Sequence, residues 1–207
     1  VSGSLDQERP ELAWRGKKID LKLPWPRHSM LDLLSEAAGE QIAVPLETKQ
    51  LAGLCHKYDL EVSAVMSPGK LLDQLFGELL EPNLQNPTFV FGYPTETSPL
   101  AKRHRDNPEL VERFELIVGG MEIANAFSEL NDPLDQRQRF EAQMKLRDAG
   151  DEEAQVLDED YIRAMEYGLP PTGGVGIGID RLVMLVTGSD TIKDVILFPQ
   201  LRPEKPA

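Results

Sequence analysis

The stretch FELIVGGMEIANAFSEL, at 114–130, is the feature that most constrains how this chain can fold. Two apolar runs flank Gly119-Gly120, a dipeptide that favours the two-residue turn of a β-hairpin. Glu115, Glu122 and Glu129 interrupt these runs, and carboxylates crowded on one sheet repel one another unless a cation lies between them. The stretch therefore predicts a hairpin that is built around a cation.

The register of this hairpin decides which of its polar side chains meet. A two-residue turn pairs Ile117 with Glu122 and places Glu115 diagonally from Glu122 on the same face, roughly 7–8 Å away. Hard cations such as Mg²⁺ take oxygen ligands, commonly one or two carboxylates together with substrate phosphates. We therefore expect Glu115 and Glu122 to bind Mg²⁺. The alternative is that both face solvent on a one-sided sheet.

Three further polar or aromatic side chains of the hairpin bear on the same site. Strict alternation would place Asn125, Phe127 and Glu129 on the face opposite Glu122. A β-bulge near Ala124, where the residues are small, would bring all of them onto one face. We therefore predict irregular pairing between residues 122 and 125.

A glycine-rich stretch, PPTGGVGIGIDRLVMLV, forms the second motif. It is neither a dinucleotide fingerprint nor a P-loop. Alternating Gly174, Gly176 and Gly178 strip one face of a strand, so that a flat group or another backbone can lie on it. Asp180 is expected to cap the next helix, with Arg181 in the first turn. A cation in the first turn of a helix gains nothing from the helix dipole, so the place of Arg181 suggests that it binds an anionic or planar ligand. The alternative is that the stretch only packs a helix on the sheet.

Composition excludes several classes of protein. The 207 residues, 41% of them apolar, suit one globular domain or one larger domain with an insertion. The net charge of −13 gives no basic surface for nucleic acid, and the basic cluster 102–105 predicts either a solvated loop or contact with phosphates. Neither a membrane span nor a signal peptide is expected. With Cys55 as the only cysteine, a disulfide framework is excluded and a cytoplasmic setting is expected.

Spacing of apolar residues and of caps predicts the elements. Long helical segments that separate the strands favour an α+β fold with an antiparallel sheet. The helices within 45–86 form a small helical insertion, and their apolar stripes are expected to be core rather than chemistry. The predicted elements are a hairpin over 12–23, helices over 30–38, 46–58, 68–80, 133–148 and 158–167, a strand in 88–94, and a last strand over 195–199.

Read together, FELIVGGMEIANAFSELNDPLDQRQRF and DEDYIRAMEYGLPPTGGVGIGIDRLVMLVTGSDTIKDVILFPQLRP closely resemble the C-terminal catalytic region of class II lysyl-tRNA synthetases. The glycine–arginine block looks like class II motif 3. The resemblance covers most of the chain, is weakest over 45–86, and assigns 1–207 to the C-terminal portion of that catalytic domain. It implies an antiparallel sheet of six or seven strands flanked by helices, and a cytoplasmic homodimer. It also implies ATP-dependent activation of lysine to lysyl-adenylate, followed by transfer to tRNA(Lys).

The resemblance implies a role for each matching residue of the hairpin. Glu115 and Glu122 match the carboxylates that hold Mg²⁺ on the ATP phosphates, so Glu115 also counts as an ATP-binding residue. Asn125, Phe127 and Glu129 match residues that surround the lysine substrate, with Glu129 facing its ammonium group. A carboxylate paired in this way would reject uncharged analogues strongly, because it would be left unpaired.

The glycine–arginine block matches the nucleotide side of the site. Arg181 corresponds to the catalytic motif 3 arginine, which contacts the γ-phosphate and stacks on adenine, and Gly176 and Gly178 give the nucleotide room. Motif 1, motif 2 and the anticodon-binding OB-fold of the family have no counterpart in this sequence. We therefore expect the isolated chain to bind ATP weakly at best and not to acylate tRNA, which the family binds mainly through those regions.

Three other functions fit parts of the pattern. Enzymes of the same fold that attach a lysine-like group to a protein typically carry His where this chain has Ser128. A non-catalytic module has no reason to keep an acidic cluster together with Arg181. Ligases for aspartate or asparagine need a cation, not an extra carboxylate, in the amino-acid pocket. A thermal-shift titration with ATP·Mg²⁺ and lysine would separate these possibilities.

Overall fold

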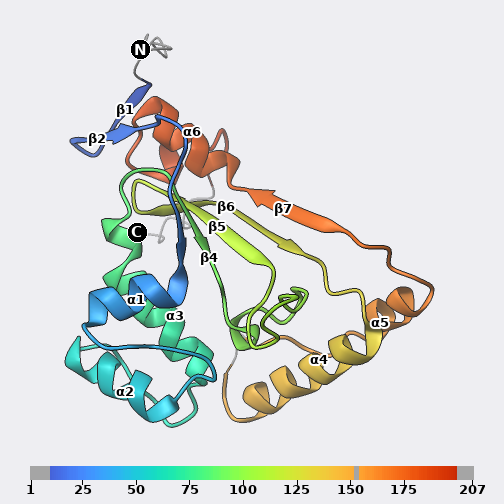
Figure 1. The fold of residues 1–207 in the computed structure, drawn as a ribbon. Helices are drawn as coiled ribbons and strands as arrows, with labels where there is room; N and C mark the ends of the chain where they lie inside the picture. The colour runs from blue at the N-terminus through green and yellow to red at the C-terminus, as the bar shows by residue number, and fades with distance from the viewer. Residues whose placement is uncertain (1–9, 152–153, 200–207) are drawn as a thin grey trace, which may run out of the picture.

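A computed structural model describes residues 10–151 and 154–199, and its centre is a five-stranded sheet (Figure 1). The strands lie in the order β3-β4-β5-β6-β7; β3 and β4 are parallel, and the other neighbours are antiparallel. They are β3 (Arg27–Ser29), β4 (Thr88–Phe91), β5 (Arg113–Val118), β6 (Met121–Ser128) and β7 (Gly173–Ile177). A separate hairpin pairs β1 (Glu11–Trp14) with β2 (Lys17–Asp20), as the sequence predicts.

Most helices begin at a side-chain cap, which supplies a partner to backbone N–H groups of the first turn. The first helix is capped in this way by Ser29, the third by Ser67, the fourth by Asp132 and the fifth by Asp158. The described residues form α1 (Met30–Ala38), α2 (Thr48–Lys57), α3 (Pro68–Leu79), α4 (Pro133–Asp148), α5 (Glu159–Glu166) and α6 (Ile179–Thr187), with short 3₁₀ turns η1 (Glu81–Asn83), η2 (Thr95–Thr97) and η3 (Ile192–Asp194). All five predicted helices are confirmed to within two residues at each end.

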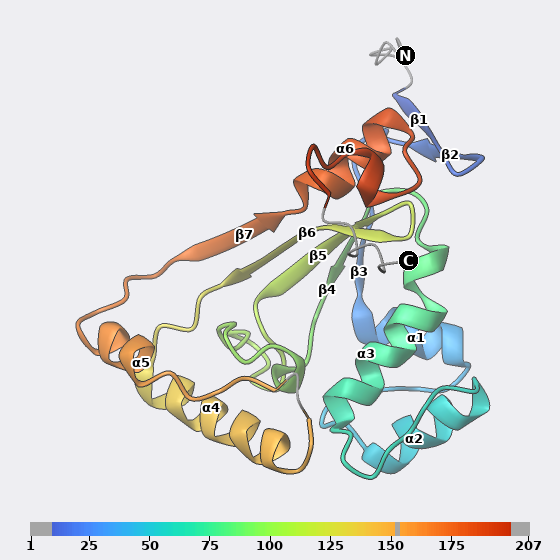
Figure 2. The ribbon, with the colours of Figure 1, turned by 180° about the vertical axis from the view of Figure 1, so that it is seen from behind.

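Two hydrophobic cores cover opposite faces of the sheet. On one face, α1, α2 and α3 pack over Val90 and Ile117. On the other face, α6 and the β1–β2 hairpin pack against Val118, with Trp14 and Met184 buried between them. Figures 1 and 2 show the strands converging near α6 and spreading toward α4 and α5, with α1–α3 beside β3. The edge strand β7 therefore runs from the α5 end of the molecule to α6.

The β5–β6 hairpin has the predicted turn and the predicted bulge. Gly119 and Gly120 both have positive φ, 62° and 72°, which glycine adopts without strain. Ile117 pairs with Glu122 but Leu116 pairs with Ala124, so Ile123 is the extra residue of the bulge. The irregular pairing predicted between residues 122 and 125 is confirmed.

Three expectations are corrected by the structure. Residues 195–199 form no strand, because Leu197 and Phe198 are exposed and have no neighbouring strand to pair with. Asp180 does not cap α6: the N-cap is Gly178, and Asp180 lies within the first turn. The sheet has five strands among the described residues rather than six or seven, and it includes a parallel pair. In those residues, no helix is long and apolar enough to cross a membrane.

Candidate active site

One row of residues crosses four strands and places the predicted site residues side by side. Val90 of β4 pairs with Glu115 of β5, Glu115 pairs with Asn125 of β6, and Asn125 pairs with Gly176 of β7. Directly paired residues point to the same face of a sheet. The row therefore runs from a buried aliphatic side chain, through a carboxylate and an amide, to an uncovered glycine. The next row on this face pairs Arg113 with Phe127 and Phe127 with Gly174.

Arg113 connects the carboxylate and the amide of this row. Its Nη2 donates to Oε1 of Glu115, its Nε donates to Oδ1 of Asn125 at 3.1 Å, and its Nη1 donates to Oγ of Ser98 at 2.7 Å. The guanidinium also lies 4.4 Å from the centre of the Tyr93 ring. The sequence reasoning did not single out Arg113. Its signal was the i, i+2 spacing to Glu115, which puts both side chains on one face of β5.

Glu115 is held between two opposing effects. The residue is buried, and desolvation raises the pKa of its carboxyl group, while the charge of Arg113 lowers it. A buried carboxylate next to a guanidinium stays ionised as part of a pair. The balance of these effects leaves the pKa of Glu115 raised, and Arg113 is the largest influence that favours its charged form.

Glu115 and Glu122 line the same cavity, about 270 Å³ in volume, together with Arg113 and two acids from α3 and η1, Asp73 and Glu81. The bulge at Ile123 makes this possible by turning Glu122 to the face of Glu115.

The two carboxylates fit a magnesium ion through the chemistry of their donor atoms. Within residues 10–151 and 154–199, no group of three or more His, Cys, Asp or Glu side chains is placed to hold a metal on its own. Mg²⁺ does not need such a group, because it keeps several waters and commonly takes one or two carboxylates plus phosphate oxygens. The assignment of Glu115 and Glu122 to Mg²⁺ therefore stays a prediction that the geometry accommodates.

Glu129 lies farther along the same face and lines another cavity. That cavity, of about 570 Å³, is bounded by Glu129, Thr172 and Gly173 together with basic residues of the 102–105 loop. A Cβ on Gly174 would collide with Oε1 of Glu129, so the glycine lets the carboxylate lie directly on β7. Partial burial raises the pKa of Glu129. No hydrogen bond or ion pair to this carboxylate occurs in the described part of the chain.

The glycine–arginine block is the more open side of the site. A Cβ on Gly176 would meet only the carbonyl oxygen of Asn125, at 3.8 Å, so the space above it is free. Arg181 Nη1 donates to the backbone oxygen of Glu122 at 2.7 Å and lies 3.7 Å from its Oε2. Half of the Arg181 side chain is exposed. Arg181 therefore touches the acidic cavity from the side of β7.

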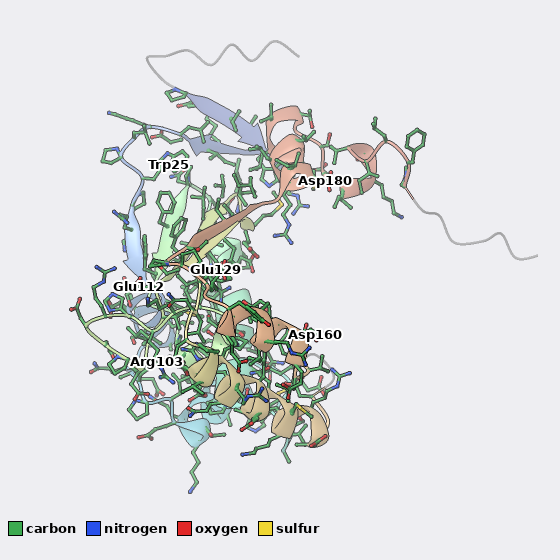
Figure 3. The ribbon with its side chains drawn as sticks, turned by 90° about the vertical axis from the view of Figure 1, so that its right-hand side faces the viewer. Trp25, Arg103, Glu112, Glu129, Asp160 and Asp180 are labelled. Carbon is green, nitrogen blue, oxygen red and sulfur yellow. The ribbon has the colours of Figure 1, made fainter. Side chains whose placement is uncertain are left out.

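The four charged residues of the predicted site share one face but not one cavity. Glu115 and Glu122 line the cavity under α3, Arg181 borders it, and Glu129 lies in the separate hollow near Thr172. Figure 3 shows Glu129 near Glu112, and Asp180, in the first turn of α6, apart from both. The chain therefore places the four residues on one face but in two cavities.

The basic loop 102–105 is mostly neutralised by acids. Arg103 pairs with Asp135 at 3.1 Å, and Arg105 pairs with Glu112 at 2.8 Å. Ser128 donates to the other oxygen of Glu112 at 2.8 Å, which accounts for a hydroxyl at that position. Exposed ion pairs contribute little energy, so the choice between a solvated loop and contact with phosphates stays a prediction.

The fold and this site define the class of protein. The family model of class II tRNA synthetases (D, K and N) matches residues 5–202, and the chain belongs to this family.

Within the family, lysine–tRNA ligases are close relatives. Those of Porphyromonas gingivalis strain W83 and Christiangramia forsetii are each 54% identical to this chain, over 192 and 190 residues, which is 93% and 92% of it. The lysine–tRNA ligase of Syntrophomonas wolfei is 50% identical over 203 residues, or 98% of the chain. The chain spans only 33% of the first two relatives and 40% of the third.

Proposed function

We propose that this chain forms the acidic and glycine–arginine walls of the active site of a lysine–tRNA ligase. The complete activity would belong to a protein of the relatives' full length: lysine is activated by ATP to lysyl-adenylate and then transferred to tRNA(Lys). The family resemblance further supports a cytoplasmic homodimer.

The observation that carries this proposal is the carboxylate of Glu129, which has no hydrogen bond or ion pair among the residues that the structure describes. A partly buried carboxylate without a partner is unfavourable unless a ligand supplies a cation. Glu129 lies on the face that also bears Asn125 and the uncovered Gly176, so an amino acid whose ammonium group meets Glu129 would extend toward the nucleotide side. Lysine supplies the cationic group that this position calls for.

The reaction needs little covalent catalysis by protein groups. The lysine carboxylate attacks the α-phosphate of ATP, a new oxygen–phosphorus bond forms, and pyrophosphate leaves. A hydroxyl of tRNA then attacks the carbonyl carbon of the adenylate, and AMP leaves. Rate should come from holding the reactants in line and from neutralising charge.

Each wall of the site has a role in this scheme. Glu129 binds the lysine ammonium group, Asn125 presents its amide to the amino acid, and Gly176 leaves room for the nucleotide. Arg181 lies at the edge of the acidic cavity, where it can meet the γ-phosphate and the adenine ring. Mg²⁺, held on the phosphates by the carboxylates of the cavity, would supply further neutralisation of charge.

The test uses a protein of full length and the lysine-dependent exchange of pyrophosphate into ATP. Glu129→Gln keeps the size of the side chain and removes its charge. The loss of this ion pair should cost about 2–5 kcal/mol of binding free energy, so kcat/KM for lysine should fall roughly 30- to several thousand-fold. Glu141→Gln, on the exposed side of α4, is the matched control and should change nothing. Unchanged exchange in Glu129→Gln would overturn the proposal.

A further inference from the structure

Arg113 contacts both halves of the proposed site through different nitrogen atoms. Nη2 holds Glu115, a predicted metal ligand, and Nε holds Asn125, a predicted lysine ligand. A guanidinium presents its donors in one rigid plane, so a movement of one contact shifts the others. The remaining donor, Nη1, is fixed on Ser98. One side chain therefore determines the placement of two groups that would bind different substrates.

The contact with Arg113 also fixes which end of the Asn125 amide faces the amino-acid side. A guanidinium has donors and no acceptor, so the atom it meets must be the amide oxygen, Oδ1. The amide nitrogen then points elsewhere with both hydrogens available. No partner for this nitrogen occurs in residues 10–151 and 154–199. Asn125 is therefore set to donate to an acceptor on a ligand, such as a carboxylate or phosphate oxygen.

Asp73 offers Arg113 a second acid. This residue of α3 lines the same cavity as Arg113 and Glu115, and its carboxylate makes no hydrogen bond or ion pair in the described residues. It lies in a cleft but remains accessible to solvent. Its pKa is raised, first by desolvation in the cleft and then by the charge of Glu115, while Arg113 lowers it. Asp73 is thus close enough to both residues to feel their charges.

A cation that binds Glu115 must compete with Arg113. The Arg113 side chain is only 16% exposed, and a charged group at that depth loses several kcal/mol if it is left without a counter-ion. Asp73 lines the same cavity and interacts with the charge of Arg113, so its carboxylate is the candidate counter-ion once Glu115 turns to a metal. Such an exchange keeps every buried charge paired, and it moves the Nε contact that orients Asn125.

We propose that Arg113 is a positioning residue that couples the two substrates: it orients Asn125 toward lysine and passes from Glu115 to Asp73 when Glu115 engages magnesium-bound nucleotide. This inference rests on the proposed function and adds to it a link between the amino-acid and nucleotide sides. Because coupling of binding is reciprocal, lysine must change the affinity for nucleotide by the same factor that nucleotide changes the affinity for lysine. The insertion that contains α3 thereby acquires a role in the site.

The experiment is a pair of calorimetric titrations on a protein of full length. Lysine is titrated alone and in the presence of Mg²⁺ with a non-hydrolysable ATP analogue, and the ratio of the two dissociation constants is the coupling factor. Typical factors are about 5- to 150-fold. In Arg113→Lys, which keeps the charge but cannot reach Glu115 and Asn125 together, the factor should fall to about 1.

Two further variants keep the test decisive. Asp73→Asn, which keeps the size of the side chain at an accessible position of α3, should lower the coupling factor while it leaves lysine affinity without nucleotide unchanged. Glu78→Gln, on the exposed side of the same helix, should behave as the unsubstituted protein does.

The possible outcomes separate this inference from the function on which it rests. An unsubstituted protein that binds neither lysine nor magnesium-bound nucleotide would overturn the proposed function. A protein that binds both without mutual effect, or keeps its coupling factor in Arg113→Lys and in Asp73→Asn, would overturn only the coupling.

Discussion

The β5–β6 hairpin and the β7–α6 segment carry the two walls of the same site, yet they are built very differently. Glu115 in the hairpin is 8% exposed and is held by a buried guanidinium. Arg181 at the start of α6 is half exposed, and its ion-pair partner Glu122 lies 3.7 Å away. Around it, apolar side chains of β7 and α6 such as Val175 and Val186 remain 65% and 60% exposed.

This contrast shows that the acidic wall is held by buried contacts within the chain, while the nucleotide wall is held by contacts that are largely exposed. Uncovered apolar side chains next to an edge strand are typical of a surface that another part of a protein covers. The relatives are two and a half to three times as long as the region they share with this chain. We therefore expect the acidic wall to keep its geometry in the 207-residue chain and the nucleotide wall to need the longer protein.

The largest expected effect comes from breaking the buried pair. Arg113→Met leaves Glu115 buried without a counter-ion and should lower the free energy of unfolding by about 3–5 kcal/mol. Arg181→Met removes an exposed pair and should cost no more than about 1 kcal/mol. Urea denaturation of both variants of the 207-residue chain measures the difference. Equal losses in the two variants would remove the contrast between the walls.

The next effect concerns activity rather than stability. Arg181→Ala in a protein of full length should lower kcat for lysine-dependent pyrophosphate exchange by about 10²–10³, the usual consequence of losing one group that stabilises transition-state charge. Its midpoint of thermal unfolding should stay that of the unsubstituted protein, because the side chain is half exposed. A large fall in the midpoint would mean that Arg181 supports the fold instead.

A smaller effect is expected at the glycines of β7. Gly174→Ala places a methyl group against Oε1 of Glu129, so the carboxylate must turn away from β7 and from the position proposed for lysine. Lysine affinity should therefore fall by roughly 5- to 100-fold. Gly176→Ala, whose methyl group would meet only a carbonyl oxygen at 3.8 Å, should spare lysine and affect nucleotide alone. Calorimetric titration with each ligand distinguishes the two sites.

The smallest effect is a dependence of stability on pH. Asp73 has its pKa raised from 3.8 to about 7 in the folded chain. The folded state then binds more protons than the unfolded state in this window, so Asp73 contributes stability that is present below pH 4 and is lost as the pH rises through about 7. Asp73→Asn should remove this slope from the thermal midpoint between pH 4 and 8. A slope that persists in the variant would assign it to other groups.

Local signals made most of the fold predictable. The cap at Ser29, the proline after Asp132 and the Gly119-Gly120 turn each act within a few residues, and the structure has these elements where the sequence places them. The prediction of a strand over 195–199 was wrong because a strand also needs a partner strand from elsewhere in the chain. Residues 195–199 are rich in apolar side chains, but no described strand lies beside them.

The site was predictable in part for the same reason. The bulge near Ala124 follows from local sequence, and with it the shared face of Glu122 and Asn125. The contribution of Asp73 could not be foreseen, because it depends on how α3 packs against the sheet. The separation of Glu129 from the acidic cavity could not be foreseen either, because it depends on long-range packing rather than on the spacing of residues in the sequence.

The extra residue at Ile123 has a consequence for how this hairpin can vary in length. Because Ile123 is the residue without a partner of its own, its deletion would let Glu122 and Ala124 follow each other in regular alternation, and residues 124–129 would keep their partners in β5 and their faces. A deletion between 125 and 129 would instead send the residues beyond it to the opposite face of the strand. The hairpin should therefore tolerate the loss of a residue at the bulge and at no other position of this segment.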